Sequence, residues 1–173
     1  MRKTNGKGRT RVTLARIKQR PIRVGGADKR ELRTQFGALC YRLRGGKVEF
    51  LLITSRGAGR WIIPKGWPMD GETPAGAAAT EAMEEAGARG KVGDQVLGFY
   101  AYSKTHKGDD LPCVVAVFPL EVKKLAKDYP EKSARKRRWV GRKQALALVE
   151  EPELRRIIKD FRPKASTAGS GAS

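Results

Sequence analysis

The sequence of 173 residues has little that could bind zinc or cross a membrane. It contains one histidine, His106, and two cysteines, Cys40 and Cys113, and none of them belongs to a zinc-binding pattern. Both cysteines lie in apolar, strand-like stretches, which favours free buried thiols in a reducing cytoplasm over a disulfide. No apolar run has the length of a membrane span, and no signal-peptide core is recognisable. We therefore expect a cytoplasmic protein without a zinc site or a membrane contact.

Acidic residues are also scarce. The chain has 18 Asp and Glu against 37 Lys and Arg, which gives a formal net charge of +19. The electrostatic field of so positive a chain attracts polyanions. By charge alone, the partner could be nucleic acid, a phospholipid surface or a polyphosphorylated small molecule. Residues 1–28 have the composition of a disordered basic arm, and residues 163–173 that of a flexible tail. The remaining residues, 29–162, are long enough for one domain with a sizeable core.

The hydrophobic pattern of this central part predicts a mixed sheet with helices on both faces. A turn at Arg44-Gly45-Gly46 joins the first two expected strands. We expect strands at 35–43, 48–54, 61–64, 96–103, 113–122 and 138–140, and two C-terminal helices at 142–149 and 152–161.

The few acidic residues include a cluster, Glu81, Glu84 and Glu85. On a helix these positions share one face, so the three carboxylates would repel one another. A divalent cation reverses this interaction, because Mg²⁺ and Mn²⁺ prefer oxygen ligands. The alternative is a solvated acidic helix face, which is common in proteins.

The residues around the cluster favour the cation site. An apolar run, 61–63, leads into a glycine loop, Thr73 is suited to the N-cap of a helix, and Pro74 to its first position. Gly87 is a natural C-terminal stop. Strand, loop and capped helix thus follow in order, with the carboxylates facing the loop. The opposite side of the helix is expected to pack closely, through Ala75, Ala79, Ala82 and Ala86, with Met83 beside them.

This stretch resembles the signature of the Nudix hydrolases, G-x5-E-x7-R-E-U-x-E-E-x-G-U, in which U is a bulky aliphatic residue. Every glycine and glutamate of the pattern is present, as Gly66, Glu72, Glu81, Glu84, Glu85 and Gly87. Three positions depart from it: Thr80 replaces the arginine, and Ala82 and Ala88 replace larger aliphatic residues. The resemblance implies an α/β fold, the Nudix-type α/β/α sandwich with a mixed sheet.

The resemblance also implies site roles. Nudix enzymes use Mg²⁺, or in some cases Mn²⁺, for attack of water on a P–O–P bridge. Glu81, Glu84 and Glu85 become the catalytic metal ligands, Glu85 being the first candidate for activating water. The backbone carbonyl of Lys65 or Gly66 completes the coordination, and Glu72 orients the loop or a second metal. In the family, the signature arginine pairs with a glutamate of the signature. Since this chain has Thr80 at that position, Lys65 or another basic residue is the candidate to pair with the glutamate instead.

Within the family, residues 35–42, 60–66, 84–93 and 137–139 look most like the diphosphoinositol polyphosphate phosphohydrolases, which also cleave diadenosine polyphosphates. A highly phosphorylated small molecule is therefore the expected substrate. Trp67 is a further candidate for substrate contact, and part of the basic run 135–138 is expected to face the phosphates. For His106, an ordinary exposed loop position is the alternative to phosphate contact. The substrate-binding candidates are Arg33, Arg60, Lys65, Lys104, His106, Lys107 and Arg138.

A second hypothesis is a catalytically weakened regulator on a Nudix scaffold that binds polyanions or nucleic acid. In this hypothesis the basic arm binds nucleic acid, and Thr80 marks lost catalysis. The three intact glutamates favour the enzyme, since a site without function has no reason to keep repelling carboxylates. For the enzyme, nucleic acid remains a possible partner of the arm but is not expected as substrate.

Overall fold

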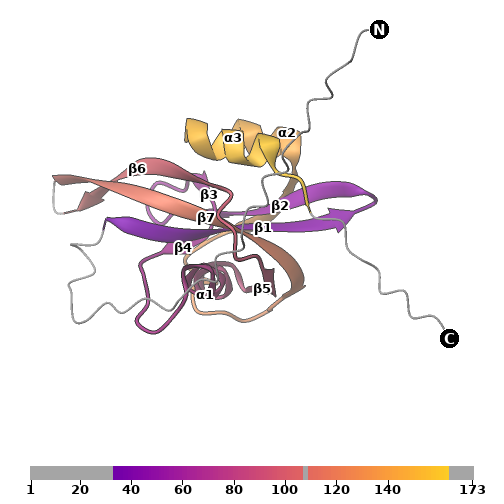
Figure 1. Ribbon diagram of the computed structural model, residues 1–173, viewed down its shortest axis with the longest axis horizontal. Coiled ribbons are helices and arrows are strands. Elements are labelled where there is room, and N and C mark those ends of the chain that lie inside the picture. The colour runs from indigo at the N-terminus through magenta and orange to yellow at the C-terminus, as the bar shows by residue number, and fades with distance from the viewer. Residues whose placement is uncertain (1–32, 107–108, 164–173) are drawn as a thin grey trace, which may run out of the picture.

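The computed structural model describes residues 33–106 and 109–163, so the expected arm at 1–28 lies outside it, as does the tail beyond residue 163. The central part consists of a sheet with one helix on one face and two on the other (Figure 1). Within these residues no helix is long and apolar enough to cross a membrane. The elements are β1 (Thr34–Arg44), β2 (Lys47–Thr54), β3 (Trp61–Ile62), β4 (Lys65–Gly66), α1 (Pro74–Ala86), β5 (Ala88–Val92), β6 (Gly98–His106), β7 (Asp109–Leu125), β8 (Arg137–Gly141), α2 (Arg142–Leu148) and α3 (Pro152–Asp160).

The sheet is mixed, as predicted. β1 and β2 form an antiparallel hairpin, whose turn uses Gly45 and Gly46 at φ 56° and 72°, values that glycine adopts without strain. β1 also pairs in parallel with the long strand β7, and β8 extends the sheet beyond β2. β7 further pairs with β5 and β6, both antiparallel.

The β1–β2 hairpin separates at the end away from its turn, and the strands β3 and β4 fill the gap. This arrangement positions the loop that precedes α1. β1 pairs with β2 only at its C-terminal end, where Tyr41 lies opposite Phe50. Its N-terminal half pairs instead with β4, with Gly37 opposite Lys65. The end of β2 pairs with β3. The segment 61–66 therefore lies between the two strands and carries the Lys65-Gly66 backbone to the face covered by α1.

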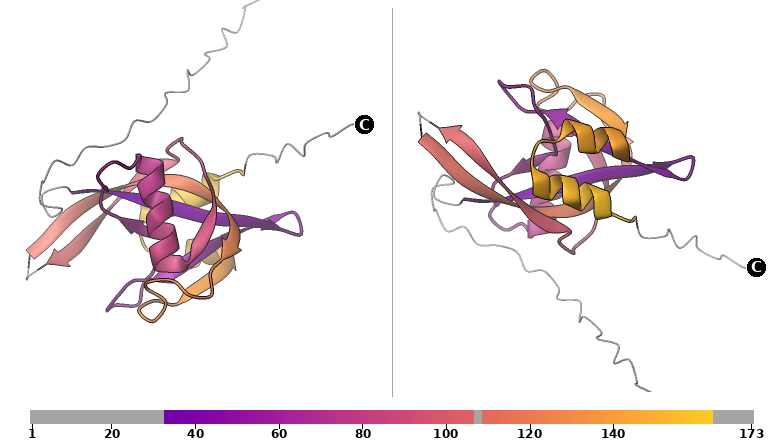
Figure 2. Two further views of the ribbon diagram at one scale, coloured as in Figure 1. Left: turned by 90° about the horizontal axis from the view of Figure 1, so that it is seen from below. Right: turned by 90° about the horizontal axis from the view of Figure 1, so that it is seen from above.

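Helix α1 covers one face of the sheet, and α2 and α3 cover the other (Figure 2). An apolar layer holds the helices on each face. On one face the small side chains of α1, including Ala78 and Ala82, pack on Phe36 and Phe118. On the other face α2 and α3 contribute Leu154 and other apolar residues to a second core cluster. Alanine on the packed side of α1 lets the helix axis approach the sheet closely. The predicted α/β/α sandwich is thus the fold observed.

The structure corrects some predicted boundaries. The strand expected at 61–64 is two short strands, β3 and β4, because Ile63 and Pro64 lie between the pairings with β2 and β1. β5 was not predicted: its central residues, Arg89-Gly90-Lys91, are exposed and lack an apolar alternation. The other expected strands and both C-terminal helices are confirmed. Cys40 and Cys113 are both buried and are not joined in a disulfide, as expected.

Candidate active site

The helix that carries the glutamates begins and ends at the predicted residues. The Thr73 side chain accepts a hydrogen bond from the backbone N–H of Gly76 at 3.0 Å, and Pro74 occupies the first turn. At the other end Gly87 has φ 64° and donates its N–H to carbonyls of the last turn. These caps fix which residues of α1 face the Lys65-Gly66 loop.

Glu85 is the most deeply placed of the three carboxylates, with 5% of its surface exposed. Its Oε2 accepts the backbone N–H of Lys65 at 3.0 Å, which joins the helix to the loop. Its Oε1 accepts a hydrogen bond from the guanidinium of Arg135. Burial raises the pKa of the Glu85 carboxyl, while Arg135 and the Lys65 N–H act to lower it. A solvated acidic face is therefore the wrong description of this residue.

Glu81 lies directly against the loop. A Cβ placed on Gly66 would be 1.7 Å from Oε1 of Glu81, so only glycine leaves room for this carboxylate. Glu81 and Glu84 are both partly exposed. Glu72 lies elsewhere: its Oε2 would be 2.5 Å from a Cβ on Gly76, so its carboxylate is at the N-terminal turn of α1, where the helix dipole favours negative charge.

The contribution of Arg135 was missed by the sequence interpretation, which treated 135–138 as one basic run. Arg135 pairs with Glu85 and Glu131, and its side chain is only 8% exposed. The guanidinium of Arg137 instead donates to the carbonyl of Ala86 at 2.7 Å, at the C-terminal end of α1. Arg138 is exposed. The run is thus divided between the carboxylate cluster, the helix end and solvent.

The donor chemistry of the site suits a hard divalent cation. Carboxylate oxygens of Glu81, Glu84 and Glu85, with the backbone carbonyls of Lys65 and Gly66, would offer such a cation an oxygen-only set of the kind that Mg²⁺ and Mn²⁺ prefer. The space left by the missing Cβ of Gly66 admits the Glu81 carboxylate. Across residues 33–106 and 109–163, however, no three His, Cys, Asp or Glu side chains converge as a preformed metal cluster. Cation binding would therefore draw the partly exposed Glu81 and Glu84 together beside the fixed Glu85.

Two of the predicted substrate-binding residues lie on aromatic rings beside the loop. The ammonium of Lys65 is 4.8 Å from the centre of the Tyr102 ring, and that of Lys104 is 5.3 Å from the Trp67 ring. Tyr102 is held by a 2.6 Å hydrogen bond to Gln35. Burial lowers the pKa of the Lys65 ammonium, and Glu85 opposes this effect.

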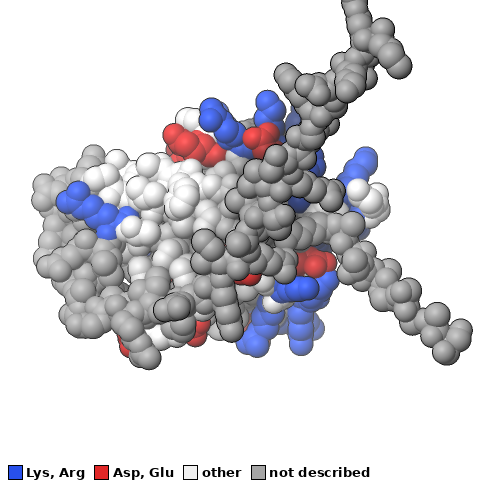
Figure 3. Space-filling view, viewed as in Figure 1, with Lys and Arg blue, Asp and Glu red and all other residues white. Residues whose placement is uncertain are grey.

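The other candidates are more dispersed. Arg60 is exposed and pairs with Glu150 at 3.2 Å, and Arg33 is exposed at the start of the described chain. The side chains of His106 and Lys107 lie outside the described residues. In Figure 3, basic side chains gather over α2 and α3, among acidic ones, and near β5 at the far end of β7. Exposed basic residues of this second group are Arg89, Lys91, Lys123, Lys124 and Lys127.

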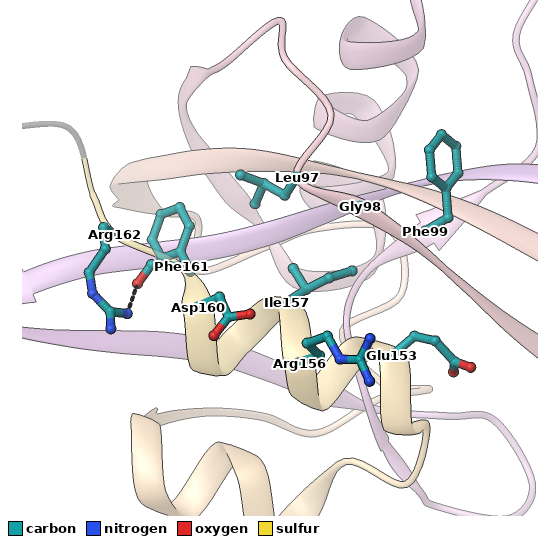
Figure 4. A pocket seen from close by; sticks show the side chains of 9 residues that line it. All are labelled: Leu97, Gly98, Phe99, Glu153, Arg156, Ile157, Asp160, Phe161 and Arg162. Atoms are coloured by element: carbon teal, nitrogen blue, oxygen red, sulfur yellow. Dashed lines mark hydrogen bonds between the residues drawn. The ribbon is translucent and has the colours of Figure 1, made fainter. Parts of the chain in front are cut away.

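A cavity of about 350 Å³ lies apart from the carboxylates, between β6 and α3 (Figure 4). None of the predicted site residues lines it. Its wall combines apolar and charged side chains, namely Leu97, Phe99, Glu153, Arg156, Ile157, Asp160, Phe161 and Arg162, together with Gly98.

Proteins with similar sequences include Nudix hydrolases. Nudix hydrolase 13, mitochondrial, of Arabidopsis thaliana is 32% identical over 121 residues, which cover 66% of this chain and 60% of the plant protein. Diphosphoinositol polyphosphate phosphohydrolase 3-alpha of Mus musculus is 30% identical over 136 residues, 78% of this chain and 79% of the mouse protein. The chain thus spans about three fifths of the plant relative's length.

Solved structures show the same fold. A C. elegans Ap4A hydrolase binary complex superposes with a TM-score of 0.55 at 22% identity, covering 73% of this chain and 92% of the other. A NUDIX hydrolase from Nitrosomonas europaea superposes with a TM-score of 0.55 at 19% identity, covering 75% of this chain and 87% of the other. Residues 33–161 match the NUDIX domain family. Since this match extends over most of the chain and includes the glutamate helix, the chain belongs to the NUDIX domain family.

Proposed function

We propose that this chain is a Mg²⁺-dependent hydrolase that cleaves a diphosphate linkage in a highly phosphorylated small molecule. The observation that carries the proposal is the contact of α1 with the loop: Glu85 accepts the Lys65 N–H, and the Glu81 carboxylate lies on Gly66. This contact brings Glu81 and Glu85 against the Lys65-Gly66 loop, on the helix face that also carries Glu84. Mn²⁺ is the alternative cation, because it accepts the same ligands.

In the proposed reaction, water attacks one phosphorus of a P–O–P bridge. A bound divalent cation would stabilise charge on the phosphate oxygens and acidify a coordinated water. The carboxylates of Glu81, Glu84 and Glu85 would hold and orient the cation, and one of them would accept the proton of the attacking water. Glu85 was the first candidate for that role on sequence grounds. Its engagement by Arg135 and the Lys65 N–H supports a ligand role, whereas the partly exposed Glu81 and Glu84 are more accessible to water.

The substrate class follows from the cations around the loop. The ammonium of Lys104 lies over the Trp67 ring, and that of Lys65 lies over the Tyr102 ring. Lys65 belongs to β4, and Lys104 belongs to β6. These ammonium groups would receive the phosphates remote from the cleaved bridge. The mouse relative is named for diphosphoinositol polyphosphate, and the C. elegans neighbour for Ap4A. We propose one of these two classes, an inositol diphosphate or a dinucleoside polyphosphate, as the substrate.

The test is phosphate and nucleotide release from both substrate classes, each with and without Mg²⁺. We expect hydrolysis of at least one substrate, abolished by chelation and restored by added Mg²⁺. Glu84→Gln is the matched variant, since it keeps the side-chain shape and removes the charge. Absence of turnover on the whole panel, with intact folding and tight binding of nucleic acid, would instead support the polyanion-binding regulator.

A further inference from the structure

The carboxylate cluster has a cationic partner that comes from outside the signature. Thr80 stands at the arginine position of the family pattern, and its hydroxyl has no charge to offer a glutamate. Arg135, from the segment between β7 and β8, donates to Glu85, and the two side chains are 8% and 7% exposed. We infer that Arg135 supplies the guanidinium that the family pattern places at position 80, and that it positions Glu85 for cation binding. The inference rests on the proposed function.

The surroundings of Arg135 hold it in place before any cation binds. Its Nε donates to Glu131, and its Nη1 donates to the backbone carbonyl of Thr54 at 3.0 Å. Together with the bond to Glu85, these contacts use three sides of the planar guanidinium, which suits arginine and not lysine. Glu131 is in turn paired with Arg56. The Arg135 side chain therefore has one defined orientation toward the helix.

Backbone bonds dock the same segment on the end of α1. The N–H of Glu131 donates to the carbonyl of Glu84 at 3.0 Å, and the N–H of Ala126 donates to the carbonyl of Gly87 at 2.8 Å. The carboxylates and Arg135 are consequently fixed relative to each other by main chain as well as by side chains. The segment after β7 thus contacts the glutamate helix, although Arg135 lies 50 residues after Glu85 in the sequence.

Lys65, the basic residue first considered for this role, contributes differently. Its ammonium lies over the Tyr102 ring, and it is the Lys65 backbone N–H that contacts Glu85. An arginine at position 80 would lie one helical turn before Glu84 on the same face. It would therefore reach the cluster from the helix itself, whereas Arg135 reaches it from the neighbouring segment. Both arrangements place a guanidinium among the same carboxylates.

This equivalence can be tested by a double-mutant cycle with Thr80→Arg and Arg135→Gln in the full chain. The readout is binding of Mn²⁺ alone, measured by the electron paramagnetic resonance signal of the free ion, so that no turnover is needed. We expect Arg135→Gln to weaken Mn²⁺ binding by about 10–100-fold, as loss of a ligand-orienting group does. Thr80→Arg should change binding little in the parent chain, but recover about tenfold in the Arg135→Gln background, because coupled sites are non-additive.

Arg44→Gln, an identical change at an exposed position at the end of β1, is the matched control and should leave Mn²⁺ binding unchanged. Thermal unfolding without metal reports whether each variant folds. If Arg135→Gln does not fold, Arg135→Lys takes its place in the cycle, since it keeps the charge but not the three-sided contacts.

The possible outcomes separate this inference from the proposed function. A parent chain that binds no Mn²⁺ would refute the proposed function. A parent that binds Mn²⁺, with a folded Arg135→Gln that binds it equally well, would overturn the role of Arg135. An equal effect of Thr80→Arg in both backgrounds would show that the two positions act independently, and would also overturn it.

Discussion

Replacing Gly66 with alanine should separate the position of the Glu81 carboxylate from the stability of the fold. A Cβ on Gly66 would lie 1.7 Å from Glu81 Oε1 and 2.0 Å from its carboxyl carbon, far inside contact distance. Gly66 is not among the glycines with positive φ, so its backbone conformation accepts alanine. The conflict is therefore between one added methyl group and one carboxylate.

The size of the effects on stability and on metal binding depends on which of the overlapping atoms can move. Glu81 is partly exposed and its carboxylate is the end of a flexible side chain, so rotation away from the loop relieves the overlap. Since alanine also restricts the unfolded chain, the free energy of unfolding should change by only about 1 kcal/mol or less. The displaced carboxylate, however, no longer faces the loop. We expect Mn²⁺ affinity and Mg²⁺-dependent turnover to fall by about 10–100-fold.

Gly90→Ala provides the opposite control. A Cβ on Gly90 would lie 1.9 Å from the backbone carbonyl oxygen of Glu121, at an irregularity in the pairing of β5 with β7. Backbone cannot rotate away, so this variant should lose about 1–3 kcal/mol of stability while its folded fraction keeps normal turnover. Denaturant unfolding and steady-state hydrolysis measure both quantities. Full turnover by Gly66→Ala, or a stability loss as large as that of Gly90→Ala, would refute the reasoning.

Two changes to the chain and one labelling experiment test other parts of the molecule. Lys104→Gln should raise KM for highly phosphorylated substrates more than for short ones, because it removes a cation beside the loop; an equal effect on both would contradict phosphate recognition there. Deleting residues 1–26 should weaken nucleic-acid binding and its salt dependence strongly, yet leave kcat/KM on small polyphosphates within about a few-fold. Burial raises the pKa of the Cys40 thiol to about 12, so this thiol stays protonated at neutral pH. A disulfide reagent should label Cys40 and Cys113 only after denaturation, and rapid labelling of the native chain would show that the core is open.

The parts of the fold that could be predicted from sequence are those governed by local rules. α1 was located by Thr73, Pro74 and Gly87, each of which acts within one or two turns of itself. β5 could not be found in this way, because its exposed Arg89-Gly90-Lys91 centre is held by pairing with β7 and not by its own apolar pattern. Pairing between distant segments overrides propensity in such strands.

The same distinction applies to the site. The spacing of Glu81, Glu84 and Glu85 placed them on one face of a helix, which is a property of the helix alone. The partner of Glu85 comes from residue 135, and nothing in the local sequence distinguishes Arg135 from its basic neighbours. Arg135 precedes β8 and follows a turn, where its backbone N–H donates to the carbonyl of Glu131 at 3.2 Å. Along β8 itself, Arg137 turns toward the end of α1 and Arg138 is exposed, since successive side chains alternate.

The three carboxylates on α1 differ in burial, and this difference bears on how the site would work. Glu85, the most buried, has one oxygen on Arg135 and the other on the Lys65 N–H, so its charge is balanced within the protein. Glu81 and Glu84 are partly exposed, where solvent and ions reach them. In the proposed function a divalent cation would offset the repulsion between these two carboxylates, beside the fixed oxygens of Glu85. Lys65 and Lys104 lie on aromatic rings beside the loop, and in the proposed function their ammonium groups would receive the phosphates remote from the cleaved bridge.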